Sequence, residues 1–390
     1  NKTSLLKIFF FTLLSILIVV LSFTALFIIL YKPSIGINNP AGDSDSIETV
    51  FSSDNEDAAP PVTSAGDPNE LRKKDFYTFL VMGRDNVGLN TDIIILLSFD
   101  ISSGAINILQ IPRDTYMEVD SSPFKINAAF AIMHNRAYNN GESDTDNAAM
   151  KGFISLLEEN LAIKIDFYVL CDLSGFRNII DIIGGVKMDI PYNMSYDDPD
   201  QDLHIDLMKG IQTLDGEKAE QFIRFRSGYI EGDIGRMDAQ KLFMSAFIKQ
   251  LKSSMKINTI TGIADEAVKN VKTSLSLADI IYFVKEFYLI DNADMNFITF
   301  PGSSARAGVT TGVWYYIMHR ADILALLNMY FNVYNSKITD ERFDSSLAFT
   351  NQKMPHINDI YISELSEDLK QLIRSAEQIN EEGLEIYLIN

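Results

Sequence analysis

The most constraining feature of this sequence is an uncharged apolar run near its start. From Ile8 to Tyr31, the stretch IFFFTLLSILIVVLSFTALFIILY contains no charged residue, glycine or proline. At about 1.5 Å per residue, a helix of this length crosses a hydrocarbon layer of about 30 Å with some tilt. A cleaved signal peptide is the alternative, but its apolar region spans roughly 7–15 residues and is followed by a small-residue cleavage site, which this stretch lacks. We therefore predict a transmembrane helix within residues 1–32.

The flanking charges predict how this helix is oriented. Lys2 and Lys7 precede the apolar run, whereas Lys32 is the only early cation after it and acidic residues soon follow. Lysine enrichment marks the cytoplasmic side of a membrane helix. We expect a single-pass protein of the cell membrane, with its N-terminal end inside and the remaining residues outside the cytoplasm.

Residues 33–70 have the composition of a solvated linker. They are rich in Ser, Asp, Asn, Gly and Pro, and show little apolar periodicity. Such a segment buries too little apolar surface to fold by itself. We expect it to be flexible and acidic, and to hold the folded part off the membrane.

Alternating strand and helix patterns after residue 70 predict a layered α/β domain. Between Phe76 and Ile111, three short β-branched runs are separated by Gly, Asn, Asp and Ser, as in buried strands at the centre of a covered sheet. Helix and strand patterns then alternate through KINAAFAIMHNRAY, NAAMKGFISLLEEN, IDFYVLCD, LSGFRNIIDII and VKMDIP. Gly184 and Gly185 should end the helix LSGFRNIIDII, and the later run ADILALLNMYFNVY is expected to form one helix. A long helix is expected from about Ile234 to Leu251, with Asp233 at its start.

The net charge of -20 restricts what this domain binds. With 33 Lys and Arg against 53 Asp and Glu, the field of the molecule repels polyphosphates at long range, so we expect no nucleic-acid partner and only local anion sites. One cysteine and four scattered histidines offer neither a disulfide nor zinc-ligand spacing. Any metal site should therefore use oxygen ligands.

The stretch FIRFRSGYIEGDIGRMDAQ concentrates arginines within this acidic chain. If Arg224 and Arg226 are extended, they point to one side, and if Asp233 begins a helix, Arg236 and Gln240 share one of its faces. Guanidinium groups suit phosphate because each donates two parallel hydrogen bonds. Convergence on one anion and ordinary surface ion pairs explain this stretch about equally well.

Further charged residues fall where the expected strands end. The loop within VMGRDNVGLNTD carries Arg84, Asp85 and Asp92, and the third strand is followed by Arg113 and Asp114. In an open α/β sheet, such strand ends form the crevice where ligands bind. Two carboxylates beside arginines suit Mg²⁺ that bridges to phosphate oxygens. An aspartate taken alone is more often a turn or cap residue.

Eight segments of the chain occur in an order that is typical of one family. They are GRD, TDIIILLSFD, ILQIPRDTYMEV, KINAAF, IDIIGGVKMDIP, LDGEKAEQFIRFR, GDIGRMDAQ and FPG. From about Phe76 to Phe331 the chain thereby resembles the LytR-CpsA-Psr family of membrane-anchored bacterial cell-wall enzymes. The resemblance implies a three-layer α/β/α sandwich with a central mixed β-sheet and an apolar groove for a polyprenyl tail. The extracytoplasmic catalytic domain would span residues 71–335, and residues 336–390 would form a C-terminal extension of unknown role.

The resemblance also implies an activity. Such enzymes use Mg²⁺ to move an anionic glycopolymer, teichoic acid or capsule, from an undecaprenyl-pyrophosphate carrier to peptidoglycan. Matched by position, Asp85 and Asp92 would hold the metal, Asp233 would be the general base and Arg113 a second catalytic residue. The pyrophosphate would be bound by Arg84, Arg113, Arg224, Arg226, Arg236 and Gln240.

One departure and two alternatives stay open. This chain has Asn90 where the family commonly has an arginine, so either Arg84 replaces that arginine or the phosphate site is weaker. The protein could instead be a non-catalytic regulator or scaffold of the cell envelope. It could also be a hydrolase of the polyprenyl pyrophosphate, because water and a sugar hydroxyl can use the same site.

The predicted topology is tested by a fused reporter. A reporter that is active only outside the cytoplasm, attached after Asn390, should be active in cells that express the chain. Activity only from a cytoplasmic reporter at the same position would contradict the topology.

Overall fold

The computed structural model describes residues 31–33, 35, 71–84, 89–119, 122–199, 203–226, 229, 233–291, 294–306, 313–346 and 373–375. The predicted membrane helix and most of the predicted linker lie outside these residues. Among the helices that are described, none is both long and apolar enough to cross a membrane.

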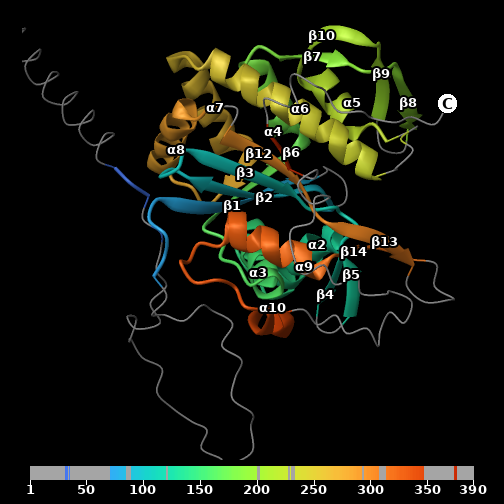
Figure 1. The fold of residues 1–390 in the computed structure, drawn as a ribbon. Coiled ribbons are helices and arrows are strands. Elements are labelled where there is room, and N and C mark those ends of the chain that lie inside the picture. Colours follow the sequence, from blue (N-terminus) through green and yellow to red (C-terminus); the bar gives the residue numbers. More distant parts are fainter. Residues whose placement is uncertain are drawn as a thin grey trace, which may run out of the picture.

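A seven-stranded mixed sheet forms the centre of the domain (Figure 1), with the strand order β11-β6-β1-β2-β3-β12-β15. β1 pairs in parallel with β6 and β3 with β12, whereas the other neighbours are antiparallel. The three runs predicted as central strands are β1, β2 and β3, so this prediction is confirmed. The strands are β1 (Phe76–Arg84), β2 (Thr91–Asp100), β3 (Ala105–Gln110), β6 (Phe167–Asp172), β11 (Val271–Thr273), β12 (Met295–Thr299) and β15 (Ile373–Ser375).

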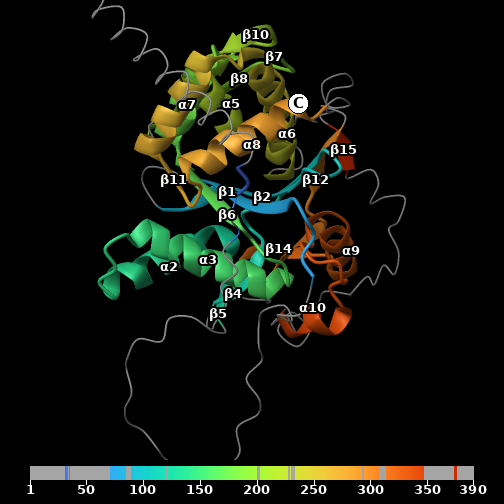
Figure 2. The same ribbon diagram turned by 90° about the vertical axis from the view of Figure 1, so that its left-hand side faces the viewer.

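Helices cover both faces of this sheet (Figures 1 and 2). One face carries α2 (Ile126–Asn139), α3 (Thr145–Leu161), α9 (Arg320–Leu326) and α10 (Asp340–Ser346). The other face carries α4 (Leu173–Ile182), α5 (Gly216–Arg224), α6 (Asp233–Ser254), α7 (Ile257–Asn270) and α8 (Leu277–Leu289). The predicted α/β class and the central mixed sheet are therefore confirmed.

The central strands send alternate side chains into two cores. In β1, Leu80 and Met82 are fully buried in the core on the side of α2 and α3. Phe79, the residue before Leu80, points to the opposite face, where its ring lies 4.9 Å from the ring of Phe283 in α8. This period of two follows from strand geometry, and it makes the sheet apolar on both faces.

The described residues also form four two-stranded sheets beside the central one. The run VKMDIP is a strand as expected, but it pairs outside the central sheet. The prediction that Gly184 and Gly185 end α4 is confirmed, because their φ angles are 84° and 82°. A Cβ at Gly185 would also lie 2.8 Å from the carbonyl oxygen of Leu214. The pairs are β7 (Val186–Ile190) with β10 (Gly210–Leu214), β8 (Met194–Asp198) with β9 (Leu203–Leu207), β4 (Tyr116–Val119) with β5 (Ser122–Lys125), and β13 (Gly302–Arg306) with β14 (Trp314–Met318).

The C-terminal part of the chain contributes to the domain in a way the sequence did not indicate. The run ADILALLNMYFNVY, predicted as one helix, is α9 followed by a π-helical turn over Leu327–Phe331. Further on, β15 adds an edge strand to β12, with Ser375 opposite Asn296. The predicted extension therefore supplies one strand of the central sheet.

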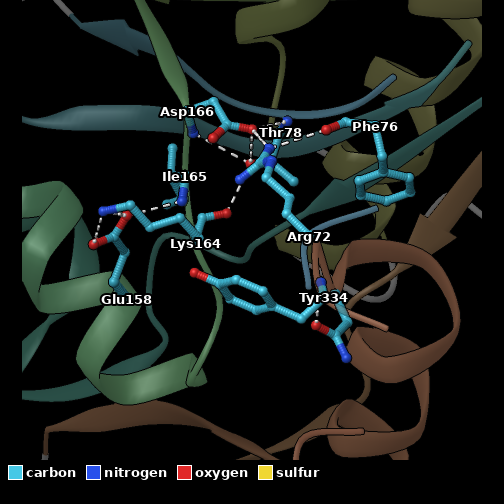
Figure 3. Close-up of polar contacts among 9 residues, drawn as sticks. Arg72, Phe76, Thr78, Glu158, Lys164, Ile165, Asp166 and Tyr334 are labelled. Carbon is cyan, nitrogen blue, oxygen red and sulfur yellow. Dashed lines mark hydrogen bonds and ion pairs between the residues drawn. The ribbon is translucent and has the colours of Figure 1, made fainter. Parts of the chain in front are cut away.

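A buried ion pair fixes the start of the sheet (Figure 3). Arg72 Nη2 donates to Asp166 Oδ2 at 2.5 Å and to the carbonyl oxygen of Phe76 at 2.9 Å. The same carboxylate oxygen accepts a hydrogen bond from the backbone nitrogen of Thr78 at 2.9 Å. The Asp166 side chain is 1% exposed, so it depends on these donors for its solvation.

We expect Asp166→Asn to lower the free energy of unfolding by about 2–3 kcal/mol, because it leaves the Arg72 charge without its partner in a mostly buried site. The measurement is urea unfolding of the purified chain, followed by far-UV circular dichroism. Asp197→Asn is the matched control, since Asp197 is 69% exposed in its pair with His204, and it should change the free energy by less than about 0.5 kcal/mol. Equal effects of the two variants would contradict this account.

Candidate functional site

The candidate site lies at the edge of the sheet where β1, β3, β6 and β12 all end. Arg84 is opposite Thr91 at the start of β2, and Thr299 at the end of β12 is opposite Gln110 at the end of β3. The side chains just beyond these residues therefore meet at one edge. This is where an open α/β sheet binds its ligands.

Arg113 and Asp92 form the ion pair at the centre of this edge. Arg113 Nη1 donates to Asp92 Oδ1 at 2.8 Å, and the two side chains are 19% and 44% exposed. Arg113 lies in the turn after β3, which the backbone nitrogen of Thr115 closes by donating to the carbonyl of Pro112 at 3.0 Å. The carbonyl of Arg113 accepts from the backbone nitrogen of Asn127, which ties the turn to α2. Local hydrogen bonds thus fix the backbone at Arg113, and Asp92 holds its guanidinium group.

Two further arginines act on Asp92. Burial would raise the pKa of its carboxyl, but the Arg113 hydrogen bond and the charges of Arg113, Arg236 and Arg226 hold this pKa below its usual value. Arg236 is 3% exposed in the first part of α6, whereas Arg226 is exposed just after α5. Three segments of the chain thus bring three positive charges to one carboxylate, as the local anion-site hypothesis requires.

Close packing behind Arg236 fixes the start of α6. A Cβ at Gly235 would lie 2.8 Å from the Cβ of Tyr229, so only glycine permits this approach. The Tyr229 ring meets that of Phe225 edge-on at 5.5 Å, and both residues are buried. Burial raises the pKa of the Tyr229 hydroxyl, and the nearby Arg236 charge acts in the opposite direction. Tyr229 is a site residue that the sequence analysis missed.

Consecutive residues of α6 attach that helix to the sheet edge. Gln240 Oε1 accepts from Gln110 Nε2 at 2.5 Å, and Gln240 Nε2 donates to the carbonyl of Ile223 at 3.0 Å. Lys241 Nζ donates to Thr299 Oγ1 and to Asp238 Oδ1. Gln240 and Lys241 are 5% and 7% exposed, so both contacts are buried. The amide of Gln240 therefore engages protein groups, and its predicted contact with pyrophosphate remains a prediction.

Two of the predicted arginines have acidic partners elsewhere. Arg224 is the last residue of α5 and donates to Glu220 Oε1 at 2.8 Å, so the extended conformation considered for it is wrong. Ile223 and Phe225, on either side of it, are buried. Arg84 donates to Asp146 of α3 at 2.7 Å. Neither contact shows Arg84 or Arg224 directed at Asp92.

The metal-binding prediction can be followed in part. Asp85 and the side chain of Asp233 lie outside the described part of the chain, although the backbone of Asp233 begins α6 as predicted. The described residues contain no group of three or more His, Cys, Asp or Glu that could hold a metal ion. Asp92 fits Mg²⁺ in its chemistry, because it is part-exposed and its lowered pKa keeps it ionised. Mg²⁺ needs only one or two carboxylates when waters and phosphate oxygens complete its shell.

Comparison with known proteins shows what the chain is similar to. The model of the LytR_cpsA_psr family matches residues 42–331. The polyisoprenyl-teichoic acid–peptidoglycan teichoic acid transferase TagV of Bacillus subtilis is 30% identical over 232 residues, which are 55% of this chain and 56% of TagV. The match thus spans little more than half of TagV. TagU of Bacillus cereus, which carries the same transferase name, is 28% identical over 258 residues, which are 65% of this chain and 77% of TagU.

Solved structures share the fold. The crystal structure of Bacillus subtilis TagV aligns with a TM-score of 0.51 at 27% identity, and the alignment covers 63% of this chain and 92% of the TagV chain in that crystal structure. A protein of Enterococcus faecalis described as a transcriptional regulator aligns with a TM-score of 0.57 at 19% identity, covering 73% of this chain and 97% of its own. The second likeness shows the fold alone. Because the family model matches residues 42–331, well over half of the chain, the chain belongs to the LytR-CpsA-Psr family.

Proposed function

We propose that this protein is a membrane-anchored transferase that moves an anionic glycopolymer, of the teichoic acid or capsule class, from an undecaprenyl-pyrophosphate carrier to peptidoglycan. The observation that carries the proposal is the ion pair of Arg113 with Asp92, a carboxylate on which the charges of Arg226 and Arg236 also act. A chain of net charge -20 has little general affinity for anions, so this local excess of guanidinium groups favours a specific anionic ligand. The transferase names of the TagV and TagU relatives support the same substrate class.

The arginines would bind the pyrophosphate and stabilise the charge that develops as it breaks. Phosphoryl transfer needs mainly positioning and charge neutralisation from the protein. Arg236 is suited to this because its burial strengthens its field, and because it lies near the N-terminal, partly positive end of α6. Arg113 is held by its turn and by Asp92, so it needs little rearrangement to meet a phosphate.

The transfer itself would move one proton and exchange one bond. The sugar hydroxyl of peptidoglycan attacks the phosphorus that carries the glycopolymer, and Asp233 accepts the hydroxyl proton. The bond from that phosphorus to the bridging oxygen breaks, and polyprenyl phosphate leaves with the electron pair. The guanidinium groups of Arg113 and Arg236 would face the leaving phosphate.

Mg²⁺ would be held by Asp92 and Asp85 and would neutralise phosphate oxygens when bound. The Asp92 carboxylate has a second task in this proposal, because it also orients Arg113. Removing its charge should therefore affect binding of the anion and use of the metal in opposite directions.

We expect Arg226→Ala and Arg236→Ala each to lower the rate of transfer about ten- to a hundredfold, since each removes charge-assisted hydrogen bonds of roughly 1.5–3 kcal/mol. The assay incubates the full chain with a pyrophosphate-linked glycan, peptidoglycan fragments and Mg²⁺. Arg136→Ala is the control, because Arg136 is exposed near the end of α2, and it should keep the parental rate. Arg236→Lys keeps the positive charge at this buried position but cannot donate two parallel hydrogen bonds, so a folded but slow Arg236→Lys variant would show that the guanidinium group itself is needed.

The products distinguish the competing functions. Parental rates from both alanine variants would defeat the arginine site. No product from the parent with a competent substrate would favour the scaffold, and free glycan without linked product would favour the hydrolase.

Asp92→Asn should tighten binding of inorganic pyrophosphate about fivefold in the absence of Mg²⁺, because it removes roughly 1 kcal/mol of repulsion between the carboxylate and the anion. The same variant should lose the stimulation of transfer by Mg²⁺. Isothermal titration calorimetry gives the first quantity and an Mg²⁺ titration of the transfer rate gives the second. Asp340→Asn removes the same charge from an exposed pair with Arg320 and should change neither. Weaker metal-free binding by Asp92→Asn would show that Asp92 does not face the anion.

A further inference from the structure

Residues that follow the predicted membrane helix directly contact the folded domain. Tyr31 Oη donates to Asp279 Oδ1 of α8 at 2.7 Å. Lys32 Nζ donates to both carboxylate oxygens of Asp75, at 2.7 and 2.9 Å, just before β1 begins. Pro33 is buried. Figure 1 shows this segment, in blue, beside α8 and the start of β1.

This segment packs as part of the domain core. The ring of Tyr31 meets that of Tyr282 edge-on at 6.4 Å, and Tyr282 in turn packs against Tyr77 of β1. Ile35 and Tyr31 both lie against the aromatic core between the sheet and α8. Several apolar and polar contacts, rather than one surface ion pair, hold the segment in place.

The Asp279 carboxylate joins two structural tasks. Its Oδ2 accepts from the backbone nitrogen and the hydroxyl of Ser276, which caps the start of α8, while its Oδ1 accepts from Tyr31. The hydrogen bonds of the helix cap thus fix this carboxylate independently of Tyr31. We call Tyr31, Lys32, Asp75 and Asp279 the juxtamembrane clasp.

The clasp places the end of the predicted membrane helix directly against the domain, with no intervening residues. The apolar run extends to Tyr31, which is itself a clasp residue. Residue 71 also lies on the domain, since its carbonyl accepts from the backbone nitrogen of Asn335 at 3.1 Å. Ile35, near the start of the predicted linker, and residue 71, just after it, therefore both lie on the domain, so the contact at Tyr31 between the predicted membrane helix and the domain does not pass through most of that linker.

The exposed surface of α8 has the side chains of a membrane-interface helix. Leu277, Tyr288 and Leu289 are 59%, 59% and 72% exposed. Lys285 is exposed as well, and its ammonium group lies 5.8 Å from the centroid of the Tyr282 ring. Leucine, tyrosine and lysine with a long apolar stem are the residues that favour the boundary between headgroups and acyl chains.

We propose that the juxtamembrane clasp seats α8 on the outer surface of the bilayer and so fixes the orientation of the domain on the membrane. The occupant of this surface is the lipid interface, because the predicted membrane helix ends on the clasp. The proposal rests on the membrane anchor of the proposed function, and it adds which face of the domain meets the lipid.

The test measures the depth of single labelled positions in the full chain. The sequence has one cysteine, Cys171, which is first replaced by serine. A fluorophore is then attached through Leu289→Cys in α8 or through Ser155→Cys, an exposed position of α3 on the opposite face of the sheet. Vesicles of phosphatidylglycerol and phosphatidylethanolamine carry a spin-labelled headgroup as quencher. The Leu289 label should be quenched about threefold more strongly than the Ser155 label.

The clasp itself is tested in the same vesicles. Tyr31→Phe combined with Lys32→Met removes the three clasp hydrogen bonds but keeps the aromatic ring and a long side chain at residue 32, and it should bring the quenching of the Leu289 label toward that of Ser155. Equal quenching of the two labels in the parent, or unchanged quenching in the clasp variant, would overturn the proposal. If the parent chain does not partition into the vesicles, the predicted membrane anchor is wrong. This outcome differs from equal quenching of the two labels, which would contradict only the proposed orientation of the domain.

Discussion

The buried hydrogen bond between Gln110 and Gln240 is the contact on which the candidate site depends. Gln240 also holds the carbonyl of Ile223, so one amide joins the end of β3, the end of α5 and the middle of α6. Each arginine that acts on Asp92 is close in sequence to one of the residues in this contact. Arg113 lies three residues after Gln110, Arg226 three residues after Ile223, and Arg236 one helical turn before Gln240. Small changes in this amide would move all three charges together.

Electrostatics explains why such a site needs an acidic residue at its centre. Three guanidinium groups brought together in a part-buried edge repel one another, and Asp92 offsets that repulsion while no anion is bound. A phosphate ligand can take over the same role, because it offers more oxygens in the same place. Elsewhere the negative charge of the protein discourages non-specific binding of other polyanions.

Local patterns were sufficient for much of the fold, but not for the contacts that assemble the site. The β-branched runs and the glycines after α4 predicted β1 to β3 and one helix end, because strand burial and positive φ angles are local properties. The hydrogen bond of Gln240 to Gln110 was not predicted, since Gln110 lies 130 residues away in the sequence. The burial of Lys241 was missed for the same reason, because its acceptor is on β12. Arg224 was considered extended, but Asp215 caps α5 and the buried Phe222 and Ile223 continue that helix through Arg224.

The rigidity of β1 has a geometric consequence for the proposed transferase, which would meet its substrate at a membrane. Asp75 of the clasp lies directly before this nine-residue strand, and Arg84 at the site edge is its last residue. At about 3.3 Å per residue, the strand separates the clasp from the site by about 30 Å. A flexible linker of the length of residues 33–70 would reach a similar mean distance, but with a spread of the same size. A strand sets an upper limit on the height of the site above the lipid headgroups and removes that spread. Encounters with a carrier that diffuses in the bilayer would then occur within one thin layer rather than throughout a volume.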